Sequence, residues 1–83
     1  MELDIKPKID KYLKELSEPM KSRVKLALYK LSKEPPEGDI KKMVGTDSFR
    51  LRVGNIRIIF NIEKDNIIVH TIGMRGQVYK KGE

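Results

Sequence analysis

The stretch SFRLRVGNIRIIFNIEKDNIIVHTIGMRGQVY, residues 48–79, decides the fold of this chain. At its centre, Gly54-Asn55 predicts a two-residue hairpin turn, because both residue types tolerate a positive φ. A hairpin closed there sets Phe49 opposite Phe60. Because side chains alternate between the two faces of a strand, one face of the hairpin then collects the apolar residues Phe49, Leu51, Val53, Ile56, Ile58, Phe60 and Ile62.

A second hairpin follows directly, with its turn at Lys64-Asp65 and with Glu63 opposite Asn66. Continuing that register gives the pairs Ile62–Ile67, Phe60–Val69, Ile59–His70 and Ile58–Thr71. Both turns therefore place the same apolar residues on one face, and a slip of one residue in either turn would break the agreement. The opposite face of the third strand is expected to be mixed, with Ile68, His70 and Ile72.

Three arginines, Arg50, Arg52 and Arg57, fall on the face opposite the predicted core. The register sets Arg52 directly across from Arg57, and like charges that face each other across strands are destabilising. Such a pair is tolerated when the side chains extend into water or when a polyanion is the usual neighbour. A simple soluble surface and an anion-binding face are therefore both open readings.

Composition limits the chain to one small domain, residues 1–83. It has 18 Lys+Arg against 12 Asp+Glu, a formal net charge of +6, and this balance favours nucleic acid or an acidic protein as partner. The absence of cysteine excludes a disulfide framework and a thiolate metal site. No apolar run approaches the roughly 18 residues that cross a membrane, and the N-terminus lacks an apolar signal segment. We therefore expect a cytoplasmic protein with no membrane partner.

The N-terminal half predicts a strand and two helices. Apolar and polar side chains alternate in residues 3–5, as in an edge strand. Pro7 suits the first turn of a helix whose apolar positions are Ile9, Tyr12, Leu13 and Leu16. Ser17 is expected to cap a second helix that ends before Pro35-Pro36. The apolar stripe of that helix is formed by Met20, Val24, Ala27, Leu28 and Leu31. The short connection predicts an antiparallel pair of helices.

Two residues of the second helix, Leu26 and Tyr29, fall outside its apolar stripe. Either the stripe is wide, or a partner helix covers this surface. After the helix, residues 34–39 form a loop. Asp39 suits a helix cap, but Gly45 follows too soon for more than a turn, so residues 40–43 predict a turn or a weak strand. A loop at 73–76 and a short last strand at 77–79 complete the expectation.

These elements together predict an α+β fold. An N-terminal strand and a helical hairpin pack on one face of a twisted, mainly antiparallel sheet of four or five strands.

The order strand, helical hairpin, antiparallel sheet, with FRLRVGNIRIIFNI followed by GMRGQVY, resembles the RelE/ParE superfamily of toxins of type II toxin–antitoxin systems. The most specific part is the pattern aromatic-Arg-Leu-Arg-x-Gly-x-x-Arg-x-x-Phe, and the resemblance covers nearly the whole chain. It implies, for the RelE branch, a ribosome-dependent endoribonuclease that cuts mRNA and inhibits translation. For the ParE branch it implies an inhibitor of DNA gyrase.

Cleavage of RNA by its own 2′-hydroxyl requires no metal or cofactor. It requires a base at the 2′-oxygen, stabilisation of the charge on the phosphate and an acid for the leaving 5′-oxygen. A guanidinium such as that of Arg57, in the middle of the open face, can hold two phosphate oxygens. One donor aimed at the transition state contributes about 3 kcal/mol. Tyr79 offers a ring for stacking on a base and a hydroxyl to relay a proton, although a tyrosine that caps the core is an open alternative.

The resemblance assigns roles that agree with this chemistry. Arg57 and Arg75 match the two catalytic arginines of the family, which stabilise the phosphate and protonate the leaving group, and Tyr79 matches its C-terminal tyrosine. Arg50 and Arg52 fall where relatives often carry basic residues on the strand before the hairpin, and we expect both to act in catalysis and RNA binding. Lys41 and Lys42 fall in the basic patch that meets ribosomal RNA.

One departure concerns the general base, because arginine hardly releases its proton whereas a lysine can. His70 is the only histidine and is expected opposite Ile59 on the open face. It is such a base, an ordinary half-buried strand histidine or a residue that contacts a partner. If it is not the base, Tyr79 or the surroundings of the substrate would have to supply one. Glu63 is the only carboxylate expected on that face, so a metal-dependent nuclease receives little support.

The predicted partners are mRNA on the ribosome and a cognate antitoxin. A cationic face next to exposed apolar helix residues suits an acidic, amphipathic antitoxin segment that folds on binding. A gyrase inhibitor and an inactive scaffold that only binds RNA or an antitoxin are the alternative functions.

Overall fold

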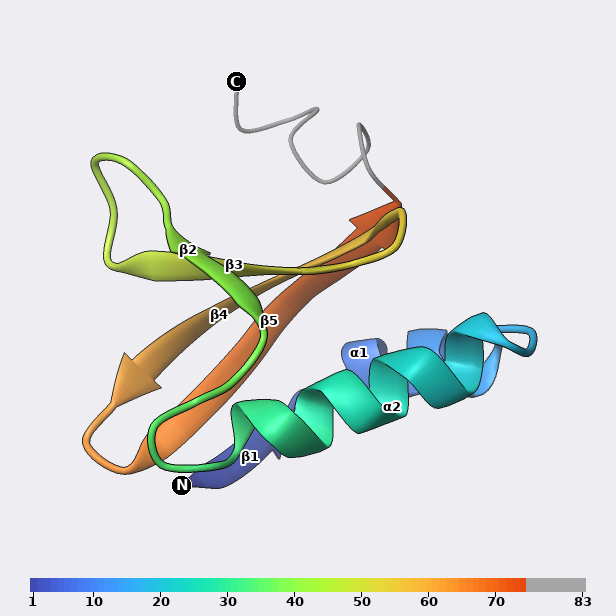
Figure 1. The fold of residues 1–83 in the computed structure, drawn as a ribbon, viewed down its shortest axis with the longest axis horizontal. Coiled ribbons are helices and arrows are strands. Elements are labelled where there is room, and N and C mark those ends of the chain that lie inside the picture. Colours follow the sequence, from blue (N-terminus) through green and yellow to red (C-terminus); the bar gives the residue numbers. More distant parts are fainter. Residues whose placement is uncertain (75–83) are drawn as a thin grey trace.

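The computed structural model describes residues 1–74, and within them two helices precede most of a sheet (Figure 1). The elements in chain order are β1 (Glu2–Ile5), α1 (Pro7–Lys14), α2 (Met20–Leu31), β2 (Asp39–Lys42), β3 (Ser48–Val53), β4 (Ile56–Glu63) and β5 (Asn66–Met74). The predicted α+β class is therefore confirmed. The short strand expected at 77–79 lies outside the described residues.

The five strands form one twisted sheet in the order β1-β5-β4-β3-β2. β1 runs parallel to β5 and the other neighbours are antiparallel, so the sheet is mainly antiparallel, as predicted. The weak strand expected near residues 40–43 is β2, which begins at Asp39 and forms one edge of the sheet. Asp39 is therefore the first residue of this strand rather than the last residue of the preceding loop.

The β3–β4 hairpin turns at Gly54-Asn55 as predicted, with Val53 opposite Ile56 and Phe49 opposite Phe60. Gly54 has a φ of +59°, so the glycine supplies the conformation that a tight hairpin turn requires. The rings of Phe49 and Phe60 stack with their centroids 5.6 Å apart. This pairing places the arginines of β3 and β4 on the face away from the core.

The β4–β5 hairpin follows the predicted register only part of the way. Glu63–Asn66 and Phe60–Val69 pair as expected, but the register shifts between Ile59 and Phe60. A β-bulge on β5 inserts one extra residue and bends the strand, so beyond it the predicted pairs of His70 with Ile59 and of Thr71 with Ile58 are wrong.

The bulge also changes which face the end of β5 presents to the core. The observed pairs after the shift are Ile59–Thr71, Ile58–Ile72, Arg57–Gly73 and Ile56–Met74. Ile72 packs against the core instead of lying on the open face, because the inserted residue reverses the alternation. The strand continues to Met74, so the loop predicted from residue 73 begins too early.

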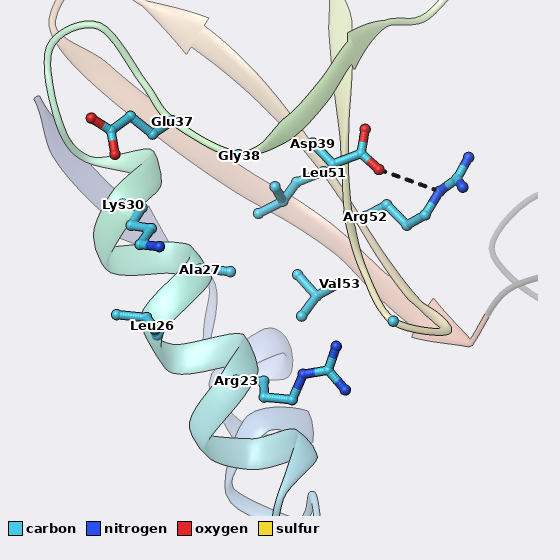
Figure 2. A pocket seen from close by; sticks show the side chains of 11 residues that line it. Arg23, Leu26, Ala27, Lys30, Glu37, Gly38, Asp39, Leu51, Arg52 and Val53 are labelled. Carbon is cyan, nitrogen blue, oxygen red and sulfur yellow. Dashed lines mark ion pairs between the residues drawn. The ribbon is translucent and has the colours of Figure 1, made fainter.

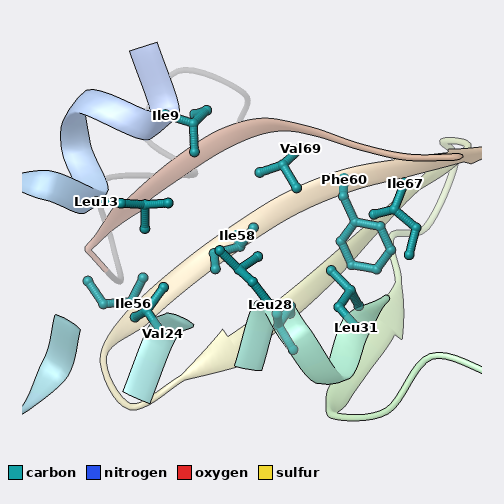
Figure 3. Close-up of a cluster of buried hydrophobic side chains, with 11 residues drawn as sticks. Ile9, Leu13, Val24, Leu28, Leu31, Ile56, Ile58, Phe60, Ile67 and Val69 are labelled. Atoms are coloured by element: carbon teal, nitrogen blue, oxygen red, sulfur yellow. The ribbon is translucent and has the colours of Figure 1, made fainter. Parts of the chain in front are cut away.

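The core lies between the two helices and one face of the sheet (Figure 3). The helices contribute Ile9, Leu13, Val24, Leu28 and Leu31, and the strands contribute Leu51, Ile56, Ile58, Phe60, Ile67 and Val69. α1 and α2 run antiparallel on the same side of the sheet, which agrees with the predicted helical hairpin (Figure 1). The opposite side of the sheet carries the candidate site.

The start of α2 differs from the prediction, because Ser17 does not cap it. α2 begins at Met20, and its N-cap residue Pro19 provides no side-chain hydrogen bond. Instead, Glu18 Oε1 accepts hydrogen bonds from the Ser22 N–H at 3.0 Å and from Ser22 Oγ at 2.7 Å. These two hydrogen bonds lower the pKa of Glu18 below its ordinary value, with a smaller contribution from nearby lysines.

Leu26 and Tyr29 project from α2 with exposed fractions of 54% and 63%. They are therefore outside the packed stripe of the helix rather than part of a wide one. In residues 1–74, neither α1 nor α2 has the length and apolar character needed to span a bilayer.

Candidate functional site

A shallow hollow of about 310 Å³ lies over β2, β3 and β4 on the side of the sheet away from the helices. We call it the basic hollow, because five of its lining side chains are cationic. The residues that line it are Lys41, Lys42, Met43, Val44, Arg50, Arg52 and Arg57. The structure therefore brings together all five basic residues of the described chain that the sequence analysis selected.

Strand register explains why these cations converge. Arg52 pairs directly with Arg57, as predicted, and Lys41 pairs with Arg50. Residues opposite each other on neighbouring strands share a face, so Lys41, Arg50, Arg52 and Arg57 all project to the same side. The neighbours Leu51 and Ile58 point the other way, into the core. The apolar pattern that fixes the core thus also fixes the basic face.

The two lysines of β2 contribute differently to the basic hollow. Lys41 lies opposite Arg50 and is exposed to solvent. Lys42 lies opposite Phe49, and its Nζ donates a hydrogen bond of 2.8 Å to the Thr46 carbonyl oxygen in the loop before β3. Lys42 is therefore tied to the loop before β3, whereas Lys41 extends into solvent.

Arg50 is buried, with only 7% of its surface exposed. A buried guanidinium is costly unless its charge is paired and its donors are satisfied. Its Nη2 lies 3.8 Å from Asp39 Oδ1, and within residues 1–74 its Nη1 is buried with no hydrogen-bond partner. The charge of Arg50 is thus paired at Nη2, while its Nη1 is buried and unsatisfied.

Asp39 is the site residue that the sequence analysis missed. Its Oδ2 also lies 3.7 Å from Arg52 Nε, so one carboxylate contacts two arginines. The expectation that Glu63 is the only carboxylate on this face is therefore wrong. The signal was the register of β2, because a strand that sets Lys41 opposite Arg50 also sets Asp39 opposite Arg52.

A second hollow of about 300 Å³ lies between α2 and the β2–β3 edge (Figure 2). Asp39 and Arg52 line it together with Arg23, Leu26 and other residues of α2 and β3. Figure 2 shows the ion pair of Asp39 with Arg52 beside this hollow. Arg52 therefore borders both hollows, whereas Asp39 lines only the second one.

His70 belongs to a hydrogen-bond network away from the basic hollow. Its Nε2 is 2.7 Å from Asn61 Oδ1, and its Nδ1 is 2.9 Å from Thr71 Oγ1. Asn61 Oδ1 is an acceptor, so Nε2 carries the proton. The side chain lines a different hollow, near α1, of about 200 Å³. These contacts favour the ordinary strand histidine over the general base.

Two of the predicted site residues, Arg75 and Tyr79, lie outside the described residues. Gly73 pairs with Arg57 near the end of β5, and the description stops at Met74. The roles expected of Arg75 and Tyr79 therefore stay predictions.

Comparison with known proteins decides the family of this chain. Residues 3–79 match the family model of the ParE toxin of the type II toxin–antitoxin system parDE. The chain belongs to the ParE toxin family. This confirms the predicted RelE/ParE superfamily. No curated protein sequence matches this ParE-family chain at a significant level.

Solved structures similar to this ParE-family toxin include RelE toxins. A chain of the RelB–RelE antitoxin–toxin complex from Methanococcus jannaschii is 27% identical, with a TM-score of 0.75 over 93% of this chain and 95% of that one. A chain of the RelE–RelB complex from Pyrococcus horikoshii OT3 is also 27% identical, with a TM-score of 0.75 over 92% and 96%. The isolated Escherichia coli RelE toxin, 18% identical with a TM-score of 0.72 over 98% and 93%, shows the same fold.

Proposed function

We propose that this ParE-family toxin is a ribosome-dependent endoribonuclease that cleaves mRNA and so inhibits translation. The observation that carries the proposal is the basic hollow, in which Arg50, Arg52 and Arg57 converge from two paired strands. Phosphate groups are recognised by such clusters of guanidinium groups. The similarity to RelE structures and the sequence resemblance to the RelE branch support the same activity.

The proposed reaction is attack of a ribose 2′-oxygen on the adjacent phosphorus. The O2′–P bond forms as the P–O5′ bond breaks, which gives a 2′,3′-cyclic phosphate and a 5′-hydroxyl. One proton leaves the 2′-hydroxyl and one is added to the departing 5′-oxygen, so the reaction is balanced without a metal or cofactor. The chain has to supply charge stabilisation and proton transfer.

Arg57 is the residue that we assign to the phosphate. It lies in β4 and borders the basic hollow opposite Arg52. Donors held in place before the reaction stabilise the extra charge of the transition state without reorganising. We assign Arg75 to the departing 5′-oxygen, which it stabilises by donating a hydrogen bond. Tyr79 stacks on a base and relays a proton, Arg50 and Arg52 are further phosphate donors, and Lys41 and Lys42 contact RNA.

We also propose that a cognate antitoxin silences this toxin. Two of the similar structures are complexes of RelE with RelB. The net charge of +6 favours an acidic segment, and the exposed Leu26 and Tyr29 favour an amphipathic one. Such a segment would cover Arg50, Arg52, Arg57 and Tyr79 or displace the residues around them. A complex structure that leaves this face bare would contradict direct occlusion.

Alanine substitution of the two assigned arginines tests the nuclease. Arg57→Ala and Arg75→Ala are expected to abolish growth arrest in cells while the far-UV circular dichroism stays that of the parent. In cells that express the parent toxin, mapping of transcript 5′ ends should show cuts between codon positions, and only on translated messages. Arg23→Ala on α2 is the matched control, because Arg23 does not line the basic hollow. Full toxicity of both variants would refute the catalytic assignment.

Inhibition of DNA gyrase is the second candidate function, and the match to the ParE toxin family favours it. Such an inhibitor acts by binding a protein and needs no arginine cluster aimed at phosphate. Induced cells would then show DNA damage before translation stops, with intact mRNA. Intact mRNA without DNA damage would instead favour the inactive scaffold.

A further inference from the structure

Asp39 contacts the arginines of the basic hollow from outside it. Asp39 lines the neighbouring hollow together with Arg52, and its carboxylate points away from α2 toward Arg52 (Figure 2). Asp39 is not among the residues that line the basic hollow. Its two oxygens nevertheless lie 3.8 Å from Arg50 Nη2 and 3.7 Å from Arg52 Nε. One carboxylate therefore forms ion pairs with two guanidinium groups that line the basic hollow.

Packing, rather than the ion pairs, sets the position of Asp39. Gly38 has a φ of +140°, and a Cβ at this residue would approach Leu51 Cδ1 to 2.9 Å. On the other side, Ile40 pairs with Leu51 and packs against the core. Because alternate residues of a strand point to opposite faces, a core-facing Ile40 directs Asp39 to the face of Arg50 and Arg52.

Arg50 depends on the ion pair with Asp39 more than Arg52 does, because Arg50 is buried. In residues 1–74, Asp39 is the only carboxylate that forms an ion pair with Arg50, and Arg50 is the one buried charged residue. The contact engages Nη2, whereas Nη1 is buried without a hydrogen-bond partner in the same residues. The ion pair therefore fixes this guanidinium at one nitrogen, beside the hollow that Arg50 lines. A planar guanidinium has the fork geometry that matches phosphate, so its orientation decides whether it can bind one.

We propose that Asp39 is a positioning residue that orients Arg50 and Arg52 toward a phosphate of bound RNA. This inference rests on the proposed nuclease function. The negative charge of Asp39 also lowers the attraction of the site for RNA, because it lies close to two of the cations. Removal of the charge should therefore tighten RNA binding while it slows cleavage. Loss of a purely structural contact would not move the affinity and the cleavage rate in these opposite directions.

Asp39→Asn tests the proposal in the full-length toxin. The rate of mRNA cleavage on saturating programmed ribosomes should fall by about 10- to 100-fold, because small errors in donor placement are costly. Binding of a 2′-O-methyl RNA oligonucleotide should tighten by about two- to fivefold. Asp39→Glu should restore part of the rate, because it keeps the charge. Asp65→Asn is the control for net charge, since Asp65 lies in the β4–β5 turn, and should cleave at the parental rate.

A second measurement separates this inference from the function on which it rests. The NMR signals of the Arg50 and Arg52 Nε–H groups, assigned with Arg50→Lys and Arg52→Lys, report side-chain order without any reaction. Asp39→Asn should shift both signals and Asp65→Asn should shift neither. If the parent toxin leaves ribosome-bound mRNA intact while Asp39→Asn moves the signals, the nuclease fails and the orienting contact stands.

Two results would overturn the positioning role while the nuclease stands. The first is cleavage by Asp39→Asn at the parental rate, whatever the signals do, because the orientation would then not matter. The second is a slower rate with unchanged arginine signals, because the loss would then have another cause.

Discussion

Glu18 stabilises the start of α2 through an interaction that depends on its charge. Its carboxylate accepts hydrogen bonds from Ser22 N–H and Ser22 Oγ, which satisfy a donor of the first helical turn. The same two hydrogen bonds hold the pKa of Glu18 below its ordinary value of 4.5. A carboxylate with a lowered pKa contributes stability that is complete above the ordinary value and is lost as the pH falls through the lowered one.

We therefore predict that Ser22→Ala destabilises the protein at pH 7 and has almost no effect in acid, where Glu18 is protonated. Urea unfolding of the parent and the variant between pH 7 and pH 3 would measure the difference in the free energy of unfolding. That difference should shrink as the pH passes below 4.5. The control is Ser32→Ala, because the Ser32 hydroxyl donates to the Tyr29 carbonyl oxygen and involves no titrating group. A constant difference for Ser22→Ala would refute the role of the Glu18 charge.

Arg50 marks the limit of sequence reasoning at the scale of the residue. Its face was predictable, because Leu51 beside it had to enter the core. Its burial was not, because burial depends on how neighbouring strands and loops close over a side chain. Asp39, its ion-pair partner, lies eleven positions earlier in the chain, and only the register of β2 joins the two.

At the scale of the element, the bulge on β5 explains why one hairpin was predictable throughout and the other only in part. Local turn chemistry determined both turns, and the β3–β4 register then followed without error. A bulge leaves little trace in an apolar strand, because an extra residue such as His70 between Val69 and Thr71 preserves the alternating pattern on either side. The sequence could therefore give the strands but not the shift between Ile59 and Phe60.

The position of the bulge predicts which single-residue deletions the β4–β5 hairpin tolerates. Removing His70 should leave Phe60–Val69, Ile59–Thr71 and Ile58–Ile72 paired as they are now, because these pairs flank the extra residue. We expect the variant to fold and to lose no more than about 2 kcal/mol in the free energy of unfolding, the range of most single changes. Chemical denaturation would measure the loss.

Deletion of Ile58 is the matched control, because it removes one residue from the partner strand. It would turn half of β4 over and move core side chains to the open face, so this variant should not fold. If the His70 deletion failed to fold as well, the bulge would be required for the sheet to form, contrary to the prediction.

At the scale of the whole molecule, the layers place all the described cations of the candidate site on the side of the sheet that the helices leave uncovered. The helices and the inner face of the sheet form the core (Figure 3). The basic hollow gathers five cations from three neighbouring strands on the other side. A single-stranded RNA bound there would displace counterions from its phosphates, so its affinity must depend on salt.

The salt dependence of RNA binding has a predictable size, and substitution of single arginines tests whether it arises in the basic hollow. The logarithm of the binding constant falls with the logarithm of salt concentration by about 0.7 for each neutralised phosphate of a single strand. A 2′-O-methyl RNA oligonucleotide that engages three to five of the cations should therefore give a slope of about −2 to −3.5.

Arg57→Ala should reduce the steepness of this slope by about 0.7, because one phosphate contact is lost. Arg23→Ala should leave the slope unchanged, although it removes the same charge from the molecule as a whole, because Arg23 lies on α2 and does not line the basic hollow. Equal slopes for the parent and both variants would mean that RNA binds elsewhere on the surface, and the proposed use of the hollow would fail even if the toxin proved to be a nuclease.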